Sequence, residues 1–135
     1  MTDTPIAVAR ANYEIVNTRD LDAIDRLYHS KVMLNGQPSR REEIREYCGA
    51  YLAAFDDLTI DVEQFVADGE WVASRVVARG THTAQFGNMP ATGRQIEVRQ
   101  NDFVRVVDGQ IVECWTLFDQ FGLLQQVGAL PAATS

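Results

Sequence analysis

The sequence predicts a single α+β domain over residues 1–135, with helices first and an antiparallel sheet after them. Two observations carry this prediction. Up to Phe55 apolar residues recur at spacings of three and four, whereas from Leu58 they alternate with a period of two. Helices and strands that are segregated along the chain are typical of α+β domains. A length of 135 residues suffices for one domain with a substantial core.

Three helices are expected before the sheet. In the first, Thr4–Thr18, Thr4 suits the N-cap and Pro5 the first helical position. A short second helix follows from Asp20. The third is expected to open at a capping box of pattern S-x-x-E, Ser39-Arg40-Arg41-Glu42. On its inward stripe Tyr51 could line a pocket with its hydroxyl or simply pack in the core.

Four longer strands and two short segments complete the predicted elements. The strands are Leu58–Val66, Trp71–Thr83 and both halves of a hairpin over Val98–Asp119; the short segments are a strand at Val32–Leu34 and a helix or coil at Phe121–Leu130. Asp108-Gly109 marks the hairpin turn, because Asp-Gly is a preferred pair where both central residues of a type I′ turn need positive φ.

Counting outwards from this turn predicts the pairing of the hairpin. The expected pairs are Val104 with Glu113, Asp102 with Trp115, Gln100 with Leu117 and Val98 with Asp119. One face would then combine Trp115 and Leu117 with three carboxylates and an amide. A mostly apolar wall with a few polar groups is typical of a ligand pocket. A half-solvated face in a binding protein is the alternative, and a bulge would exchange the two faces beyond it.

The opposite face of the hairpin is also too apolar to lie in water comfortably. It is expected to carry Phe103, Val112, Cys114 and Phe118 between Arg99 and Arg105. We therefore expect a homodimer that forms through this face.

Arg75 lies on the strand Trp71–Thr83, of which either alternation set could face the pocket. A guanidinium in an apolar wall would need a carboxylate partner. Arg75 on an outer, solvated face fits the sequence equally well.

Charge and composition exclude several classes of protein. A net charge of −7 argues against nucleic acid or anionic membranes as partners. No apolar run approaches the ~20 residues of a membrane span, and residues 1–13 lack the pattern of a signal peptide. We expect a cytoplasmic protein in which Cys48 and Cys114 are reduced. Two scattered histidines and the lack of nucleotide-binding motifs predict no metal and no cofactor.

Several motifs resemble the SnoaL-like polyketide cyclase family of the NTF2-like superfamily. They span nearly the whole chain: Asn17–Asp22, Ala54–Leu58, Gly80-Thr81-His82, Pro90–Arg94, Phe103–Arg105, Asp108–Glu113 with Trp115 and Asp119, and Gln125–Gly128. The resemblance implies an NTF2-like cone, in which a strongly curved antiparallel sheet and three N-terminal helices enclose a pocket, usually in a dimer. The combination is far more specific for the family than for one reaction, since this fold hosts many chemistries.

The resemblance also implies a site. The family's cyclases close a ring in a polyketide ester by an aldol reaction without metal or cofactor, and the motif assigns the proton shuttle to Asp119. Related epoxide hydrolases use an Asp–Arg–Asp set, in which Asp119 and Arg75 match but Val77 replaces the first acid. That departure counts against epoxide hydrolysis, while a ketosteroid isomerase-like proton transfer stays open.

Residues and resemblance together predict an acid–base enzyme for a hydrophobic, oxygenated small molecule. Asp119 would be the catalyst beside Trp115, and Gln100 and Asp102 would bind substrate oxygens. His82 is expected to hold a loop, with substrate contact as the alternative. A non-catalytic ligand-binding module of the same fold is the competing interpretation.

Overall fold

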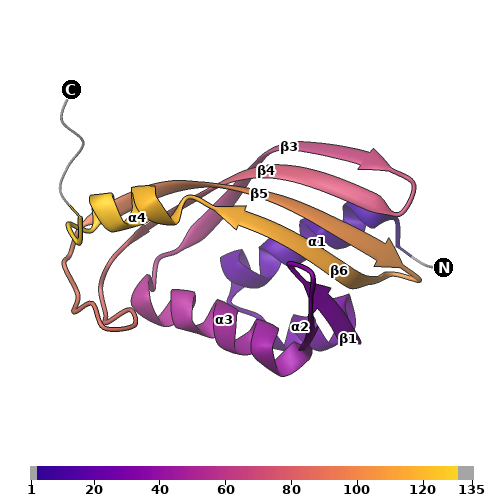
Figure 1. The fold of residues 1–135 in the computed structure, drawn as a ribbon, viewed down its shortest axis with the longest axis horizontal. Helices are drawn as coiled ribbons and strands as arrows, with labels where there is room; N and C mark the ends of the chain where they lie inside the picture. Colours follow the sequence, from indigo (N-terminus) through magenta and orange to yellow (C-terminus); the bar gives the residue numbers. More distant parts are fainter. Residues whose placement is uncertain (1–2, 131–135) are drawn as a thin grey trace.

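The computed structural model describes residues 3–130 and consists of one curved sheet with helices packed on one side (Figure 1). The helices are α1 (Pro5–Thr18), α2 (Ile24–Leu27), α3 (Arg41–Ala54) and α4 (Gln120–Gln126), with a 3₁₀ turn at Leu21–Ala23. The strands are β1 (Tyr28–Leu34), β2 (Gln37–Arg40), β3 (Thr59–Asp68), β4 (Trp71–Thr81), β5 (Gln95–Val107) and β6 (Gln110–Phe118). The predicted α+β class and the curved-sheet architecture are confirmed.

The sheet has the order β2-β1-β6-β5-β4-β3. Its last four strands form the expected antiparallel meander, but β1 runs parallel to β6, so the sheet is mixed. The second predicted helix is only the 3₁₀ turn and the four-residue α2. The helices α1, α2 and α3 cover one face of the sheet, and α4 continues from the end of β6 (Figure 1).

The local sequence pattern predicts the N-cap of α1 correctly but not that of α3. Thr4 caps α1 as predicted, because its Oγ1 accepts a hydrogen bond from the backbone N–H of Ala7 at 3.2 Å. The predicted capping box is wrong. Ser39 lies in β2, and its hydroxyl donates to Oε2 of Glu43 at 2.7 Å instead of capping α3. Strand pairing of β2 with β1 thus takes precedence over the local cap.

The hairpin turns at Asp108-Gly109 as predicted, with φ of 51° and 76°. Beyond Ile111, however, the predicted register is wrong. Val106 pairs with Ile111 but Arg105 pairs with Glu113, which leaves Val112 without a partner as a one-residue bulge.

The bulge changes which residues of β6 face the helices. Cys114, Thr116 and Phe118 pair with Val104, Asp102 and Gln100 and face inwards with them. Trp115 and Leu117 turn outwards, where they are 45% and 75% exposed.

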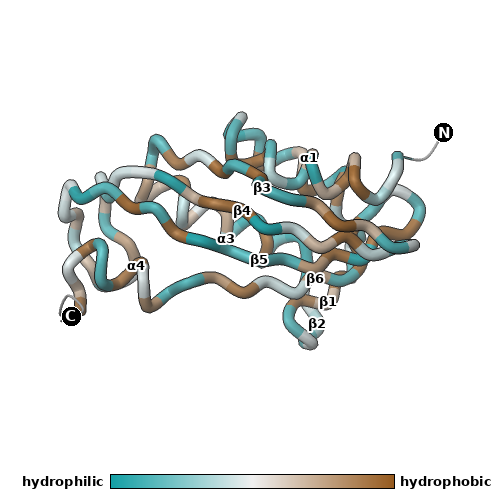
Figure 2. The backbone as a smooth tube through the Cα atoms, turned by 90° about the horizontal axis from the view of Figure 1, so that it is seen from above, coloured by the Kyte–Doolittle hydropathy of each residue, from teal (hydrophilic) through white to brown (hydrophobic). Residues whose placement is uncertain are grey.

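Two hydrophobic clusters fill the space between sheet and helices. One gathers around α1, α2 and β1 and includes Ile24, Val32 and Ile111. The other lies around the end of α3 and α4 and includes Phe55 and Leu123. In Figure 2 the tube of the sheet strands alternates between hydrophilic and hydrophobic positions, as expected where one face packs and the other meets solvent. None of the helices within residues 3–130 is long and apolar enough to cross a membrane.

The Asp108-Gly109 turn gives a test of the fold. We predict that Gly109→Val lowers the free energy of unfolding by about 1–2 kcal/mol, because a β-branched residue resists the left-handed φ at this position. Thermal unfolding measures the change. Gly49→Ala is the control, since the nearest atom to an added Cβ in α3 is 3.9 Å away and alanine favours a helix. Equal melting temperatures for Gly109→Val and wild type would contradict the assignment.

The predicted dimer surface is wrong in part, because two of its residues do not lie on the outer face of the sheet. Cys114 is buried and Phe118 turns inwards, so neither can take part. Instead an outer apolar row crosses the sheet through Val66, Ala73, Phe103 and Trp115, neighbours in register on β3 to β6. Val66 and Phe103 are 56% and 54% exposed. We propose that this row joins two copies of the chain.

Light scattering tests the dimer. At micromolar concentration we expect about twice the 15.1 kDa mass of one chain, and a shift to the single mass in Phe103→Lys. His29→Lys, a charge change at an exposed residue of β1, serves as the control. A wild-type protein that weighs one chain would contradict the proposal.

Candidate active site

A cavity of about 500 Å³ lies between the helices and the inner face of the sheet. Helices α1 and α3 and strands β1, β3, β4, β5 and β6 all contribute to its wall, and residues of both hydrophobic clusters line it. All four tyrosines of the chain line this cavity: Tyr13, Tyr28, Tyr47 and Tyr51. Such a mixture of apolar surface and a few hydroxyls and amides is typical of a small-molecule site.

Asp102 places a carboxylate in this cavity. It lies on β5 with its side chain inwards and is 4% exposed. Its Oδ2 accepts a hydrogen bond from the Tyr13 hydroxyl at 2.5 Å. The Gln100 amide donates to Oδ1 at 3.1 Å and to Oδ2 at 2.8 Å. These bonds compensate part of the cost of burying the carboxylate, and they fix where its oxygens point.

Among the cavity-lining residues that the structure describes, Asp102 alone is a carboxylate, and no lysine, arginine or histidine accompanies it. Burial, and next the negative charge of Asp102, raise the pKa of Tyr13. Burial likewise raises the pKa values of Tyr28, Tyr47 and Tyr51. At neutral pH the cavity therefore presents neutral hydroxyl donors around a single carboxylate.

Three of the predicted site residues lie in the cavity: Gln100, Asp102 and Tyr51. Tyr51 contributes an aromatic wall, with ring centroids 5.1 Å from Tyr47 and 5.7 Å from Phe118. Tyr13 also lies in the cavity, and the sequence does not distinguish it from a core residue. Its helical spacing is that of a buried stripe, and the pairing of its hydroxyl with Asp102 is a contact across 89 residues that no local pattern signals.

Trp115 and Arg75 lie outside the cavity, so neither is in place to bind a substrate there. For Trp115 this makes the prediction wrong, whereas for Arg75 it agrees with the outer, solvated alternative and not with the pocket. The bulge at Val112 turns Trp115 outwards, where its indole N–H donates to Glu113 at 2.6 Å. Arg75 belongs to the outward set of β4, its side chain is 55% exposed, and it pairs with Glu63 at 3.5 Å. The inward set of β4 contains the buried residues Val72, Ser74, Val76 and Ala78.

Asp119 is exposed, contrary to the expectation that it would lie in the pocket beside Trp115. It is the N-cap of α4, and its Oδ1 accepts a hydrogen bond from the backbone N–H of Gly122 at 2.9 Å. Its chain neighbours Phe118 and Gln120 line the cavity, whereas Asp119 does not. The carboxylate therefore lies at the edge of the site and stabilises a helix start.

His82 is fully buried and holds the loop between β4 and β5. Its backbone N–H donates to Arg94 and its carbonyl accepts from Gly93, both at 2.9 Å. The ring Nδ1 lies 2.9 Å from the Thr92 hydroxyl and the ring stacks on Phe55. The histidine does not line the cavity, and these contacts fit the expected loop-holding role.

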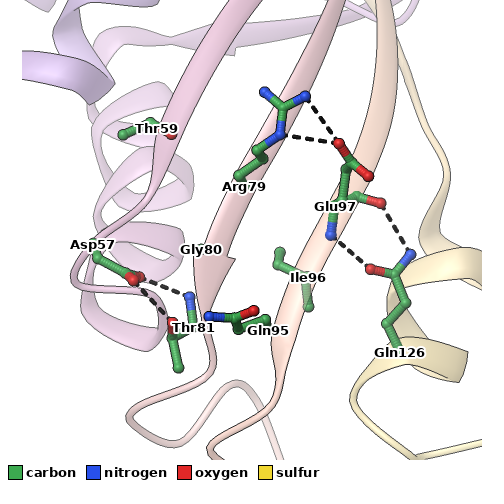
Figure 3. Close-up of a pocket in the computed structure, with 9 residues that line it drawn as sticks. All are labelled: Asp57, Thr59, Arg79, Gly80, Thr81, Gln95, Ile96, Glu97 and Gln126. Carbon is green, nitrogen blue, oxygen red and sulfur yellow. Dashed lines mark hydrogen bonds and ion pairs between the residues drawn. The ribbon is translucent and has the colours of Figure 1, made fainter.

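A second depression of similar volume lies at the end of β4 and β5 near α4 (Figure 3). Several of its polar groups bind one another. Arg79 Nε donates to Glu97 at 2.9 Å, and Asp57 accepts from the backbone N–H and hydroxyl of Thr81. The amide of Gln126 pairs with the backbone N–H and carbonyl of Glu97, which fastens α4 to β5. We assign structural roles to these groups, and place the candidate active site in the inner cavity.

A curved sheet closed by helices around a mostly apolar cavity with a few polar groups is the architecture expected of an NTF2-like cone. Comparison with known proteins makes the assignment specific: the SnoaL-like polyketide cyclase family matches residues 6–127, and the chain belongs to this family.

Individual relatives agree with this assignment. An aklanonic acid methyl ester cyclase of Streptomyces peucetius is 26% identical over 133 residues, covering 93% of this chain and 91% of the relative. The crystal structure of IdmH from Streptomyces antibioticus, a candidate polyketide cyclase, is 33% identical, with a TM-score of 0.84 over 93% of this chain and 99% of that one. TsrD from Streptomyces laurentii has the same fold at 24% identity, with a TM-score of 0.83 over 92% of this chain and 94% of that one.

The two cavity cysteines give a test of the site. Burial raises the pKa of Cys48 to about 11 and that of Cys114 to about 12. For Cys48 the shift lowers the thiolate fraction at pH 8 by about 100-fold, and only the thiolate is nucleophilic. We predict slow reaction of both thiols with a disulfide reagent at pH 8, accelerating as the pH rises. The protein unfolded in guanidinium is the control, and equally fast reaction of the folded protein would contradict the burial of these thiols.

Proposed function

We propose that the protein closes a ring in a neutral, oxygenated, hydrophobic small molecule by proton transfer at a carboxylate in the cavity. Family membership and a relative named for cyclising aklanonic acid methyl ester support the reaction class. The observation that carries the proposal is Asp102, a carboxylate that is 4% exposed in an otherwise uncharged wall. An intramolecular aldol closure needs only proton transfers, so we expect no metal or organic cofactor.

The charge of the wall favours a neutral substrate. A carboxylate or phosphate group in the cavity would be buried near Asp102 without a cation among the described lining residues. Ketones and esters avoid this cost, and their oxygens can accept hydrogen bonds from tyrosine hydroxyls. The aliphatic part of the wall, including Val16, Leu34 and Ile44, suits a carbon skeleton.

In the proposed reaction, Asp102 takes a proton from the carbon next to a substrate carbonyl, which leaves an enolate. The enolate carbon attacks a second carbonyl carbon of the same molecule, and a carbon–carbon bond forms. The alkoxide that results takes the proton back from Asp102. Tyr13 and Gln100 hold the carboxylate in place throughout. General acid–base catalysis of this kind contributes roughly 10²–10⁴-fold.

Asp119 is the second candidate for the proton shuttle. Its family motif favours it, and its neighbours Phe118 and Gln120 line the cavity. To reach a substrate, its carboxylate would have to leave the backbone N–H of Gly122 and uncap α4. Asp102 requires no such rearrangement, and we therefore assign the shuttle to Asp102.

A non-catalytic ligand-binding module is the second candidate function. The hydrogen bonds of Tyr13 and Gln100 to Asp102 favour it, because a carboxylate held in this way could serve binding alone. Epoxide hydrolysis is not proposed, since Arg75 lies on the outer face and Val77 replaces the first acid of that set.

Paired substitutions test the assignment, with aklanonic acid methyl ester as the probe and chromatography of its cyclised product. We predict that Asp102→Asn lowers kcat/KM by at least about 100-fold while the probe still binds. Asp119→Asn should stay within a few-fold of wild type, as should Asp25→Asn, a surface control.

The other outcomes separate the candidates. A large loss in Asp119→Asn alone would transfer the shuttle to Asp119, and wild-type turnover in both variants would remove the mechanism. Binding without turnover by the wild type would favour the non-catalytic module.

A further inference from the structure

Asn12 brings a second amide into the cavity, from the helix that also supplies Tyr13. The two residues are consecutive on α1, and both line the cavity that contains Asp102. One turn of helix thus presents the hydroxyl that binds Asp102 and, next to it in the chain, an amide whose hydrogen bond goes to Tyr28 and not to that carboxylate.

Tyr28 fixes the orientation of this amide. Its hydroxyl donates to the Oδ1 of Asn12 at 2.8 Å. Tyr28 is 5% exposed, and its hydroxyl has no other hydrogen-bond partner within residues 3–130. If the amide were flipped, the buried hydroxyl proton of Tyr28 would lose its acceptor, which is costly. The amide oxygen therefore faces Tyr28.

The other end of the amide is available. The Nδ2 group of Asn12 has no acceptor in the described part of the protein, and it is not among the buried polar atoms that lack a partner. The group is therefore not buried, and Asn12 itself lines the cavity. The neighbouring amide of Gln100 differs, because its Nε2 already donates to both oxygens of Asp102.

Proton abstraction next to a carbonyl creates a need for such a donor. When a carboxylate removes the proton, negative charge moves onto the carbonyl oxygen of the substrate. A preorganised neutral donor that meets this oxygen stabilises the enolate more than the starting ketone. A second carboxylate cannot serve, and the described wall offers no cation.

We propose that the Nδ2 group of Asn12 donates to the substrate carbonyl oxygen that becomes the enolate, with Tyr28 as the positioning residue that orients it. This assignment rests on the proposed function and adds the electrophilic partner to the base Asp102. The proton moves from carbon to Asp102, and the electron pair of the broken C–H bond moves to the oxygen facing Asn12. In the next step this electron pair forms the new carbon–carbon bond, and the proton passes from Asp102 to the alkoxide oxygen of the second carbonyl, which becomes the alcohol.

An enolate mimic tests the donor without knowledge of the natural substrate. We use 2-naphthol, whose ionised oxygen resembles an enolate and whose fluorescence distinguishes its neutral and ionised forms. The titration is done in Asp102→Asn, where the competing negative charge is gone. Adding Asn12→Ala to this variant should weaken naphtholate binding at least about 10-fold, and adding Tyr28→Phe should weaken it less. Naphthalene, which has no oxygen, should bind all of these variants equally.

The controls separate this proposal from the proposed function. Asn88→Ala, in an exposed loop, should leave binding unchanged. Equal naphtholate affinity with and without Asn12→Ala would overturn the donor assignment, as would failure of 2-naphthol to bind where naphthalene does. If Asp102→Asn binds naphtholate no better than wild type, the charge assigned to Asp102 fails, whereas the effect of Asn12 is still measured.

A second measurement covers the case in which Asn12→Ala does not fold, since the substitution leaves Tyr28 without its acceptor. The side-chain amide proton signals of Asn12 are followed by NMR in Asp102→Asn as 2-naphthol is added. We expect a downfield shift of one of these protons. Saturating 2-naphthol without any change in this amide would overturn the proposal.

Discussion

The one-residue bulge at Val112 is the constraint on which the site depends. Because side chains of a strand alternate between faces, one unpaired residue reverses every position that follows it in β6. The reversal turns Thr116 and Phe118 towards the helices, opposite Asp102 and Gln100, and turns Trp115 to solvent. Without the bulge an indole would stand beside Asp102 and fill part of the cavity. The bulge therefore makes room for a ligand next to the carboxylate.

A buried carboxylate without a cation among the described lining residues is costly, and hydrogen bonds from described residues offset part of that cost. Tyr13 and Gln100 satisfy Asp102 from α1 and from its own strand, and the raised pKa of Tyr13 keeps this phenol a neutral donor. Because Asp102 is almost fully buried, its field reaches a bound ligand with less screening than in solvent. The charge of Asp102, which no cation among the described lining residues compensates, also disfavours anionic ligands. The proposed base and the proposed selectivity for neutral ligands therefore have the same physical origin.

The sequence was sufficient for the fold class, the Asp108-Gly109 turn and the family, because each depends on local pattern or on a motif. It was also sufficient to bring Gln100, Asp102 and Tyr51 to the candidate site. It could not reveal the bulge, since Val112 is apolar and suits either face of a strand, and the error carried Trp115 into the predicted pocket. It could not assign Asn12, Tyr13 and Tyr28 to the site either, because their hydrogen-bond partners are distant in the chain. Asp119 matches the family motif, yet its carboxylate caps α4 in this structure.

The central claim is that a neutral ligand reacts beside Asp102 in the inner cavity. A crystal structure of Asp102→Asn with a bound polyketide ester analogue tests this most directly. The account predicts the ligand between α1, α3 and β5, with a carbonyl oxygen or its neighbouring carbon within about 3.5 Å of the residue 102 side chain. Two results would contradict the account: an analogue that binds in the second depression beside Arg79 and Glu97, or one whose reacting carbonyl lies at Asp119 and away from residue 102.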